Sequence, residues 1–405
     1  MDRVILHCDL NAFYASVELL DYPELQKQPV AVCGDPQARH GVILAKNQLA
    51  KAAGVQTAET VWQAKRKCLN LILLPAHHEK YARYSKLAGE IYERYTDLIE
   101  PFGIDESWLD LTGTLHLLGG DAKQAADEIR AVMKTELGLT LSVGVSFNKV
   151  FAKLGSDYRK PDATTVISRD NYRQIVWPLP VRDLLFVGKV AAQTLESHGI
   201  HTIGDLAHAS REGLEGLLGK HGSQLYDYAT GAEHSKVLPL WEQPPPKSVG
   251  NGFTFRRDLR GWEEIKTGVA YLADQVAMRL RRHELAATTL QVSIRSPDFQ
   301  TISRQKRLAC PTALYRDLME QSMELIRQNW RVEKPIRALT ITAAGLVGDE
   351  EGGEQLNLFQ LDRVQQREKL SRLEDTVAAL RSRYGKGAIG FASAPLPGEG
   401  NDGKD

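Results

Sequence analysis

An apolar stretch that two adjacent carboxylates interrupt at its centre places the strongest constraint on the fold of this chain. Residues 101–111 read Pro-Phe-Gly-Ile-Asp-Glu-Ser-Trp-Leu-Asp-Leu, and hydrophobic alternation resumes after the acids. This pattern predicts a strand, a tight turn that carries Asp105 and Glu106, and a second strand. Two acids in an apolar hairpin are costly to bury unless positive charge meets them. A divalent cation on a phosphorylated substrate would meet that need, and a solvated turn is the alternative.

Another acid, Asp9, follows a second apolar run. Residues 4–8 read Val-Ile-Leu-His-Cys and predict a buried central strand, after which Phe13 and Val17 recur at helical spacing. Asp9 therefore lies where a strand ends and the chain reverses. That position is usual for a site residue in an α/β layer and is also ordinary for a helix-capping Asp.

The 405 residues are enough for roughly two to four domains, each with its own core. The sequence contains no run of eighteen apolar residues and no N-terminal signal pattern, so we expect a soluble intracellular protein with no membrane partner. Its four cysteines, Cys8, Cys33, Cys68 and Cys310, lie far apart and lack zinc-ligand spacing. We therefore expect free thiols in a reducing compartment.

The formal net charge is zero, so charge balance alone argues neither for nor against a nucleic-acid partner. The distribution of charge is more informative, because residues 247–337 hold 17 basic and 10 acidic side chains. This excess fits a surface that follows a phosphate backbone. A basic, solvated face remains the alternative.

Hydrophobic periodicity predicts an α+β layer in the first half of the chain, with a sheet covered by helices on one face. The predicted strands are 30–34, 41–45, 139–147 and 164–167, and the predicted helices are 46–53, 78–100, 122–137 and 151–158. Gly54 and Gly138 are placed to end two of these helices.

The second half changes character twice. Residues 171–231 predict short helices punctuated by glycine, and a glycine hairpin at a helix N-terminus exposes N–H groups to phosphate. The proline-rich residues 238–247 predict a stiff linker. Beyond it we expect the strands 290–295 and 336–342 and the long helices 263–283 and 312–329. A last helix, 363–384, carries one apolar face made of Val364, Leu370, Leu373, Val377, Leu380 and Tyr384, and the final dozen residues are expected to be disordered.

Asp9 with residues 13–18 (Phe-Tyr-Ala-Ser-Val-Glu), and Asp105-Glu106 some ninety-five residues later, resemble the Y-family, or translesion, DNA polymerases. The resemblance runs in unbroken order over roughly residues 1–345. It continues through residues 41–43, 142–146, 148–153, 160–161, 202–206 and 247–250.

The resemblance implies a right-hand polymerase with a palm made of a sheet plus helices, small fingers, a helix-hairpin-helix thumb and an α/β little-finger domain. The implied boundaries are 1–12 and 77–168 for the palm, 13–76 for the fingers, 169–235 for the thumb, 236–246 for a linker, 247–345 for the little finger and 346–405 for a tail.

The chemistry implied by the resemblance is template-directed, low-fidelity DNA synthesis with two Mg²⁺ ions. Asp9 and Asp105 would bridge both ions, and Glu106 would complete the primer-side ion. The backbone carbonyl of Leu10 would serve the triphosphate-side ion. Such a pair of cations can lower the pKa of the primer 3′-hydroxyl and neutralise the departing pyrophosphate.

Nucleotide contacts are implied for Asn11, Ala12, Phe13, Tyr14 and Lys160. Tyr14 resembles the family's sugar gate, a ring that leaves no space for a 2′-hydroxyl, and Lys160 would contact phosphates.

Two parts of the family pattern are altered in this chain. At three further nucleotide-binding positions the family usually has Thr, Tyr and Arg, where this chain has Ala45, Gln48 and Lys51. In the thumb, Phe186 stands where the first hairpin glycine is usual. The implied DNA contacts are Gly188, Lys189, Arg295, Arg304 and Arg337.

Near the C-terminus, Gln355-Leu356-Asn357-Leu358-Phe359 resembles the peptide by which bacterial polymerases bind the sliding clamp, with Gln355 in a polar subsite and Leu356, Leu358 and Phe359 among the contacts. The expected partners are primer-template DNA, deoxynucleoside triphosphates and the sliding clamp. We expect a monomer in the bacterial cytoplasm that associates with the nucleoid when it is bound to DNA.

Two other classes of function remain open at this stage. One is a different two-metal phosphoryl-transfer enzyme on a similar palm, such as a cyclase or nuclease. The other is a catalytically silent scaffold that binds DNA or the clamp. The glycine-hairpin and basic regions argue against the first, and the presence of all three carboxylates argues against the second.

Overall fold

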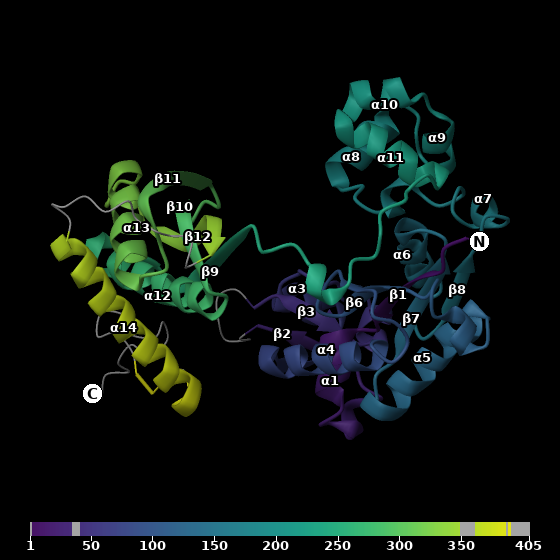
Figure 1. The fold of residues 1–405 in the computed structure, drawn as a ribbon, viewed down its shortest axis with the longest axis horizontal. Coiled ribbons are helices and arrows are strands. Elements are labelled where there is room, and N and C mark those ends of the chain that lie inside the picture. Colours follow the sequence, from purple (N-terminus) through teal and green to yellow (C-terminus); the bar gives the residue numbers. More distant parts are fainter. Residues whose placement is uncertain (1, 35–40, 349–360, 386–387, 390–405) are drawn as a thin grey trace. The chain divides into compact units, whose positions relative to one another are not determined.

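The computed structural model describes residues 2–34, 41–348, 361–385 and 388–389 (Figure 1). Within these ranges the chain divides into two compact units, with the division between Gln243 and Pro244. The first unit contains a five-stranded sheet, a three-stranded sheet and a group of short helices, and the second contains a four-stranded sheet. In these ranges no helix is both long and apolar enough to cross a membrane.

Strand β1 is the central strand of the five-stranded sheet. All six of its residues are buried, which explains why its sequence lacks alternation. The strand order is β5-β6-β1-β7-β8, and β1 is antiparallel to both of its neighbours. The strands are β1 (Ile5–Leu10), β5 (Ile99–Pro101), β6 (Glu106–Asp110), β7 (Leu141–Ser146) and β8 (Thr164–Ile167). The expected acidic hairpin is therefore β5-turn-β6.

Helices cover both faces of this sheet, and the expectation of one covered face was wrong. They are α1 (Phe13–Leu19), α4 (His78–Tyr92), α5 (Ala122–Leu137) and α6 (Lys149–Tyr158). On one face Leu6 and Cys8 of β1 share a core with residues of α4 and α5, such as Tyr81 and Ile129. On the other face Ile5 and Trp108 pack with Ala152 of α6. Helix α6 was predicted, but its polar residues gave no sign that it lies on a sheet.

Helix α6 approaches β7 so closely that only glycine fits at the contact. A Cβ atom added to Gly144 would lie 1.9 Å from the carbonyl oxygen of Ala152, and one added to Gly155 would lie 2.9 Å from the Cα of Gly144. The two glycines therefore set the distance at which α6 holds its side chains over the sheet.

Replacing Gly144 with alanine is expected to destabilise the first unit by about 3 kcal/mol or more, because the clash is with backbone that cannot rotate away. Urea unfolding of the full chain measures the change. Gly216→Ala is the matched control: a Cβ there meets nothing within 4 Å, and alanine in an exposed helix should stabilise by about 0.5–1 kcal/mol. A Gly144 variant as stable as the wild-type chain would contradict the close approach.

The small three-stranded sheet has the order β3-β2-β4. Its elements are β2 (Val30–Cys33), β3 (Ile43–Lys46), β4 (Ile72–Pro75), α2 (Gln48–Ala52) and α3 (Val61–Lys67). Asn47 fixes the start of α2, because its side-chain oxygen accepts hydrogen bonds from the backbone N–H groups of Ala50 and Val30. A capping box between Thr60 and Gln63 begins α3. Neither α3 nor β4 was predicted.

Short helices after the five-stranded sheet form their own core. They are α7 (Tyr172–Ile175), α8 (Lys189–Ser197), α9 (Ile203–His208), α10 (Arg211–Leu218) and α11 (Lys220–Thr230). That core includes Phe151 and Leu154, so it packs directly on α6. Phe186 adopts a positive φ of 67° and is half exposed. The hairpin thus keeps a conformation that favours glycine although the residue is phenylalanine.

The second unit is a four-stranded antiparallel sheet of order β11-β10-β12-β9, with two helices packed on one face (Figure 1). The elements are β9 (Ser248–Leu259), α12 (Gly261–Arg282), β10 (Leu285–Arg295), β11 (Thr301–Thr312), α13 (Tyr315–Asn329) and β12 (Ile336–Gly348). Strands β9 and β11 were not predicted. Strand β12 runs three residues past 345, the expected end of this domain.

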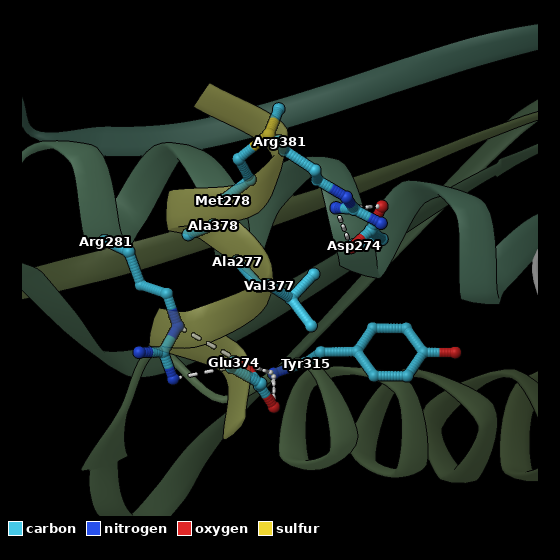
Figure 2. Close-up of a pocket in the computed structure, with 9 residues that line it drawn as sticks. All are labelled: Asp274, Ala277, Met278, Arg281, Tyr315, Glu374, Val377, Ala378 and Arg381. Atoms are coloured by element: carbon cyan, nitrogen blue, oxygen red, sulfur yellow. Dashed lines mark hydrogen bonds and ion pairs between the residues drawn. The ribbon is translucent and has the colours of Figure 1, made fainter. Parts of the chain in front are cut away.

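The C-terminal helix α14 (Leu361–Tyr384) docks on the helices of the second unit (Figure 2). The buried carboxylate of Glu374 accepts hydrogen bonds from the backbone N–H of Tyr315, at the start of α13, and from the guanidinium of Arg281. Arg381 pairs with Asp274 of α12 at 2.9 Å. The structure thus supplies the partner that the sequence left open, and it lies within the same chain.

The expected apolar face of this helix was confirmed only in part, because Leu370, Val377 and Leu380 are half-buried. Leu373 and Tyr384 are exposed, and Val377 lies at the contact between the two charged anchors, Glu374 and Arg381. Val364 lies outside the side chains that the structure describes. Because hydrophobic periodicity weighs only apolar residues, it missed a face that is held by buried ion pairs.

Candidate active site

An open cavity of about 380 Å³ lies beside the acidic hairpin in the first unit. Its lining comes from β1, the start of α1, β3 and the β5–β6 turn. The lining residues are Asp9, Leu10, Ala12, Phe13, Tyr14, Leu44, Ala45, Lys46, Thr57, Ile104, Asp105, Glu106 and Lys160. Three carboxylates and two ammonium groups thus face one polar space.

Strand pairing brings the two distant acidic segments together. Asp9 and Glu106 are direct cross-strand partners on β1 and β6, and the N–H of Leu10 donates a hydrogen bond to the backbone oxygen of Asp105. Lys153 of α6 lies between the two carboxylates, 3.3 Å from Asp9 and 3.0 Å from Glu106. The register therefore places all three acids at the same end of the sheet.

Asp9 is the most buried of the three acids, with 5% of its surface exposed. Lys160 lies 2.5 Å from its Oδ2 and also pairs with Asp157 of α6 at 2.8 Å. Burial raises the pKa of Asp9 to about 6, although the charges of Lys160 and Lys153 act against this rise. The site therefore holds a desolvated carboxylate that two lysines do not fully compensate.

The pKa values of Asp105 and Glu106 are shifted in opposite directions. Burial, followed by the charge of Glu106, raises the pKa of Asp105. Burial also opposes ionisation of Glu106, but its contact with His7 and the charge of Lys153 outweigh that cost and lower its pKa. Burial lowers the pKa of His7 to about 4, so the imidazole is neutral near pH 7.

The donor set fits a hard divalent cation, because carboxylate and backbone carbonyl oxygens are the ligands that Mg²⁺ prefers. In the part of the chain that the structure describes, however, no three His, Cys, Asp or Glu side chains are grouped closely enough to hold a metal ion. Lysine ammonium groups contact Asp9 and Glu106 instead. A cation would compete with the lysines for these oxygens.

Tyr14 forms part of the cavity wall and is held in place from behind. Its ring stacks on that of Tyr81 with centroids 4.0 Å apart and planes 12° apart. Tyr81 is fully buried, and its hydroxyl donates to Glu18, which is also buried. The stack prevents the Tyr14 ring from moving back, so it forms a rigid part of the wall.

Several predicted nucleotide contacts lie away from the cavity lining. Asn11 is buried, and its amide pairs with Thr140 and Ser142, so it fixes the turn after β1. Gln48 and Lys51 are exposed on α2 and do not line the cavity, whereas Ala45 does.

The structure adds two residues that the sequence reasoning missed. Lys46 donates a hydrogen bond to Thr57 at 3.0 Å, and both line the cavity. Burial, followed by the charge of Lys51, lowers the pKa of Lys46. Lys46 was predicted to begin the helix 46–53, whereas it is the last residue of β3. Its only sequence signal was a cation directly after Ala45.

The predicted DNA contacts on the thumb lie at one helix end. Gly188 is the N-cap of α8 and Lys189 is its first residue, and both are exposed. Their placement agrees with a helix N-terminus that is open to an anion.

The predicted DNA contacts of the second unit do not share one face. Arg295 pairs in register with Thr301, whereas Arg304 pairs with the core residue Val292 and therefore lies on the helix-covered face. There its Nε donates to Asn329 of α13. Arg307, which was not predicted, is exposed on the same face as Arg295. Arg337 lies over the ring of Phe299 at 4.5 Å.

The predicted clamp-binding residues Gln355, Leu356, Leu358 and Phe359 lie outside the described residues.

Comparison with known proteins agrees with this fold. Residues 8–157 match the impB/mucB/samB family, and residues 246–358 match the C-terminal domain of the same family. DNA polymerase IV of Acetivibrio thermocellus is 46% identical over 385 residues, which cover 95% of this chain and 96% of that protein. DNA polymerase IV 1 of Bacillus subtilis is 38% identical over 95% of this chain and 91% of its own length.

A solved chimeric Y-family DNA polymerase superimposes with a TM-score of 0.74 at 21% identity, over 85% of this chain and 99% of that one. The fold is therefore that of a Y-family DNA polymerase. The chain belongs to the DNA polymerase IV branch of that family. It is a DNA-directed DNA polymerase of the translesion type, and this membership implies dependence on a divalent metal ion.

Proposed function

We propose that Asp9, Asp105 and Glu106, with the backbone carbonyl of Leu10, hold two Mg²⁺ ions for the transfer of a deoxynucleotide to a primer 3′-end. The observation that carries this proposal is the pairing of Asp9 with Glu106 beside an open cavity that Asp105 also lines. When bound, the two ions would lower the pKa of the primer hydroxyl and neutralise the leaving pyrophosphate. Primer extension with Mg²⁺ as the added divalent ion, by the wild-type chain and an Asp105 variant, tests the assignment.

The remaining cavity residues bind and orient the incoming nucleotide in this proposal. Lys160 and Lys46 supply ammonium groups for the triphosphate, and both lie in the cavity lining. Tyr14 lies under the sugar, next to Ala12 and Phe13, and excludes a 2′-hydroxyl. Ala45 leaves space where the family usually has a larger polar residue. From outside the cavity lining, Lys51 would act through its charge and Gln48 through hydrogen bonds.

The parts of the chain are assigned by analogy with the family. The five-stranded sheet with α4, α5 and α6 is the proposed palm, and the small sheet with α2 and α3 is the proposed fingers domain. Helices α7–α11 form the proposed thumb, and the second unit before residue 349 is the proposed little finger. The division between Gln243 and Pro244 falls inside the proposed linker.

DNA is held without sequence readout in this scheme. Gly188 and Lys189 contact phosphate at the start of α8. Arg295 and Arg307 contact the duplex backbone from the face of the sheet that α12 and α13 leave uncovered. Arg304 is bonded to α13 and is not favoured for this role. We further propose that the protein works in the bacterial cytoplasm, on the nucleoid when it is bound to DNA, because its relatives above are bacterial.

We also propose that Gln355, Leu358 and Phe359 bind the sliding clamp. Changing all three to alanine should reduce clamp-stimulated synthesis at least about tenfold, because the tethered contact raises the effective concentration of primer ends. Distributive synthesis without the clamp should stay unchanged. Primer extension with and without loaded clamp measures both values.

Leu69→Ala is the control for this experiment, because Leu69 is 92% exposed in the proposed fingers and lies far from residue 355 in the chain. Equal stimulation of the triple variant and the wild-type chain would exclude the motif.

A further inference from the structure

His7 is a buried side chain that the proposed mechanism does not yet use. It lies in β1, two residues before Asp9, on the face of the sheet that α6 covers, and none of its surface is exposed. The rings of Trp108 and Phe102 meet it edge-on, with centroids at 5.3 Å and 6.4 Å. These contacts fix the plane of the imidazole, so its two nitrogens point in defined directions.

One nitrogen points at α6 and the other at the acidic hairpin. Nδ1 lies 2.8 Å from the hydroxyl oxygen of Ser156. Nε2 lies 3.5 Å from Oε2 of Glu106, at the outer limit of a hydrogen bond, and no other partner for it exists among the described residues. A carboxylate oxygen only accepts hydrogen bonds. If Nε2 carried the lone pair, two acceptors would face each other in a buried place, which is costly.

The hydroxyl of Ser156 decides which nitrogen carries the hydrogen. It can donate to the backbone oxygen of Lys153, 2.8 Å away, or to Nδ1 of His7. The Lys153 oxygen lies inside α6, where a carbonyl normally accepts from the N–H four residues later. The hydroxyl can therefore turn to His7 without leaving that oxygen unpaired. A hydroxyl that donates to Nδ1 leaves the hydrogen of a neutral ring on Nε2.

We propose that Ser156, His7 and Glu106 form an ordered chain of donors, in which the hydroxyl donates to Nδ1 and Nε2–H donates to Glu106. His7 is then a positioning residue for Glu106. It holds one carboxylate oxygen, Oε2, while Lys153 contacts the other, Oε1. The inference rests on the proposed function, since the role of Glu106 as a metal ligand is itself proposed. Partners that orient a ligand in this way are worth about 10–100-fold in metal affinity or activity.

The test uses two substitutions of His7 that distinguish the role of Nε2 from that of Nδ1. The amide of glutamine reaches the place of Nε2 and can still donate to Glu106, whereas the shorter amide of asparagine reaches only the place of Nδ1. We expect His7→Asn to lower kcat about 10–100-fold and to raise the Mg²⁺ concentration for half-maximal rate. The KM for nucleotide and the affinity for DNA should stay unchanged. His7→Gln should recover most of the loss. Equal behaviour of the two variants would overturn the positioning role.

A second measurement does not depend on activity. Long-range ¹H–¹⁵N spectra of the metal-free chain with ¹⁵N-labelled histidine report the tautomer, and the signal that His7→Gln removes identifies His7. We expect the Nε2–H form in the wild-type chain and a mixture in Ser156→Ala. The Nδ1–H form in the wild-type chain would overturn the proposal, whether or not Ser156→Ala folds.

Glu106→Gln separates this inference from the proposed function. If Glu106→Gln is fully active, the assignment of Glu106 as a ligand fails. If Glu106→Gln is inactive while His7→Asn behaves as the wild-type chain does, only the positioning role fails.

Discussion

Replacing Asp105 with alanine should abolish nucleotide addition while the chain still binds primer-template DNA. The Asp105 carboxyl group lines the cavity, and burial raises its pKa. Since folding disfavours its ionised form, removing this group should cost little stability. Its backbone oxygen, which holds Leu10, is unaffected by the substitution. Metal-ion stabilisation of a transition state is worth several kcal/mol, and we therefore expect kcat to fall at least about a thousand-fold.

Single-nucleotide insertion under rapid mixing measures this loss, and fluorescence anisotropy of labelled primer-template measures binding. Asp110→Ala is the matched control, because Asp110 lies at the other end of β6, where its carboxylate accepts from the N–H of Thr112. That variant should lose the hydrogen bond to Thr112 and the 3.6 Å ion pair with Arg3, together roughly 1–2 kcal/mol, and keep the wild-type rate. An Asp105 variant that extends primers at the wild-type rate would remove Asp105 from the site.

Replacing Tyr14 with alanine should allow ribonucleotides to enter. The ring forms part of the cavity wall and stacks on the fully buried Tyr81, so it cannot yield to a 2′-hydroxyl. Without the ring the added hydroxyl meets open space. A pocket that only excludes a hydroxyl by shape discriminates by about a hundredfold, and we expect most of that discrimination to disappear.

The measurement is the ratio of kcat/KM for a deoxynucleotide to that for the matching ribonucleotide. Tyr14→Phe is the control, because it keeps the ring and its stacking and removes only the hydroxyl, so its discrimination should stay near wild type. If Tyr14→Ala discriminates as well as the wild-type chain, another residue closes the sugar position.

Elements with strong local signals were predicted well, although the helix predicted over 78–100 ends at Tyr92 and its last two residues belong to β5. The limits of α5 match because periodic apolar residues run to Gly138, which adopts the positive φ of a helix C-cap. The buried strand that carries Asp9 and the acidic hairpin were also confirmed as elements. In each case the information lies within about fifteen neighbouring residues.

Features that depend on tertiary contacts were not predictable. The second covered face of the sheet depends on the fit of Gly144 against α6, which no pattern in either segment reveals. Arg295 and Arg304 both looked like strand residues near phosphate, but only the register of β10 with β11 shows that they lie on opposite faces. Similarly, Asn47 fixes α2 through its bonds to Val30 and Ala50, which keeps Gln48 and Lys51 out of the cavity lining.

Because α14 docks on the second unit, a molecule that binds residues 349–360 can lie only a limited distance from that unit. Residues 349–360 connect Gly348 of β12 to Leu361 of α14, and both elements belong to the second unit. Even fully extended, twelve residues span only about 40 Å, so their midpoint reaches roughly 20 Å from its two attachment points. If a ring-shaped processivity factor bound this segment, the point of contact would stay within that radius of the second unit, because the segment is attached to that unit at both of its ends.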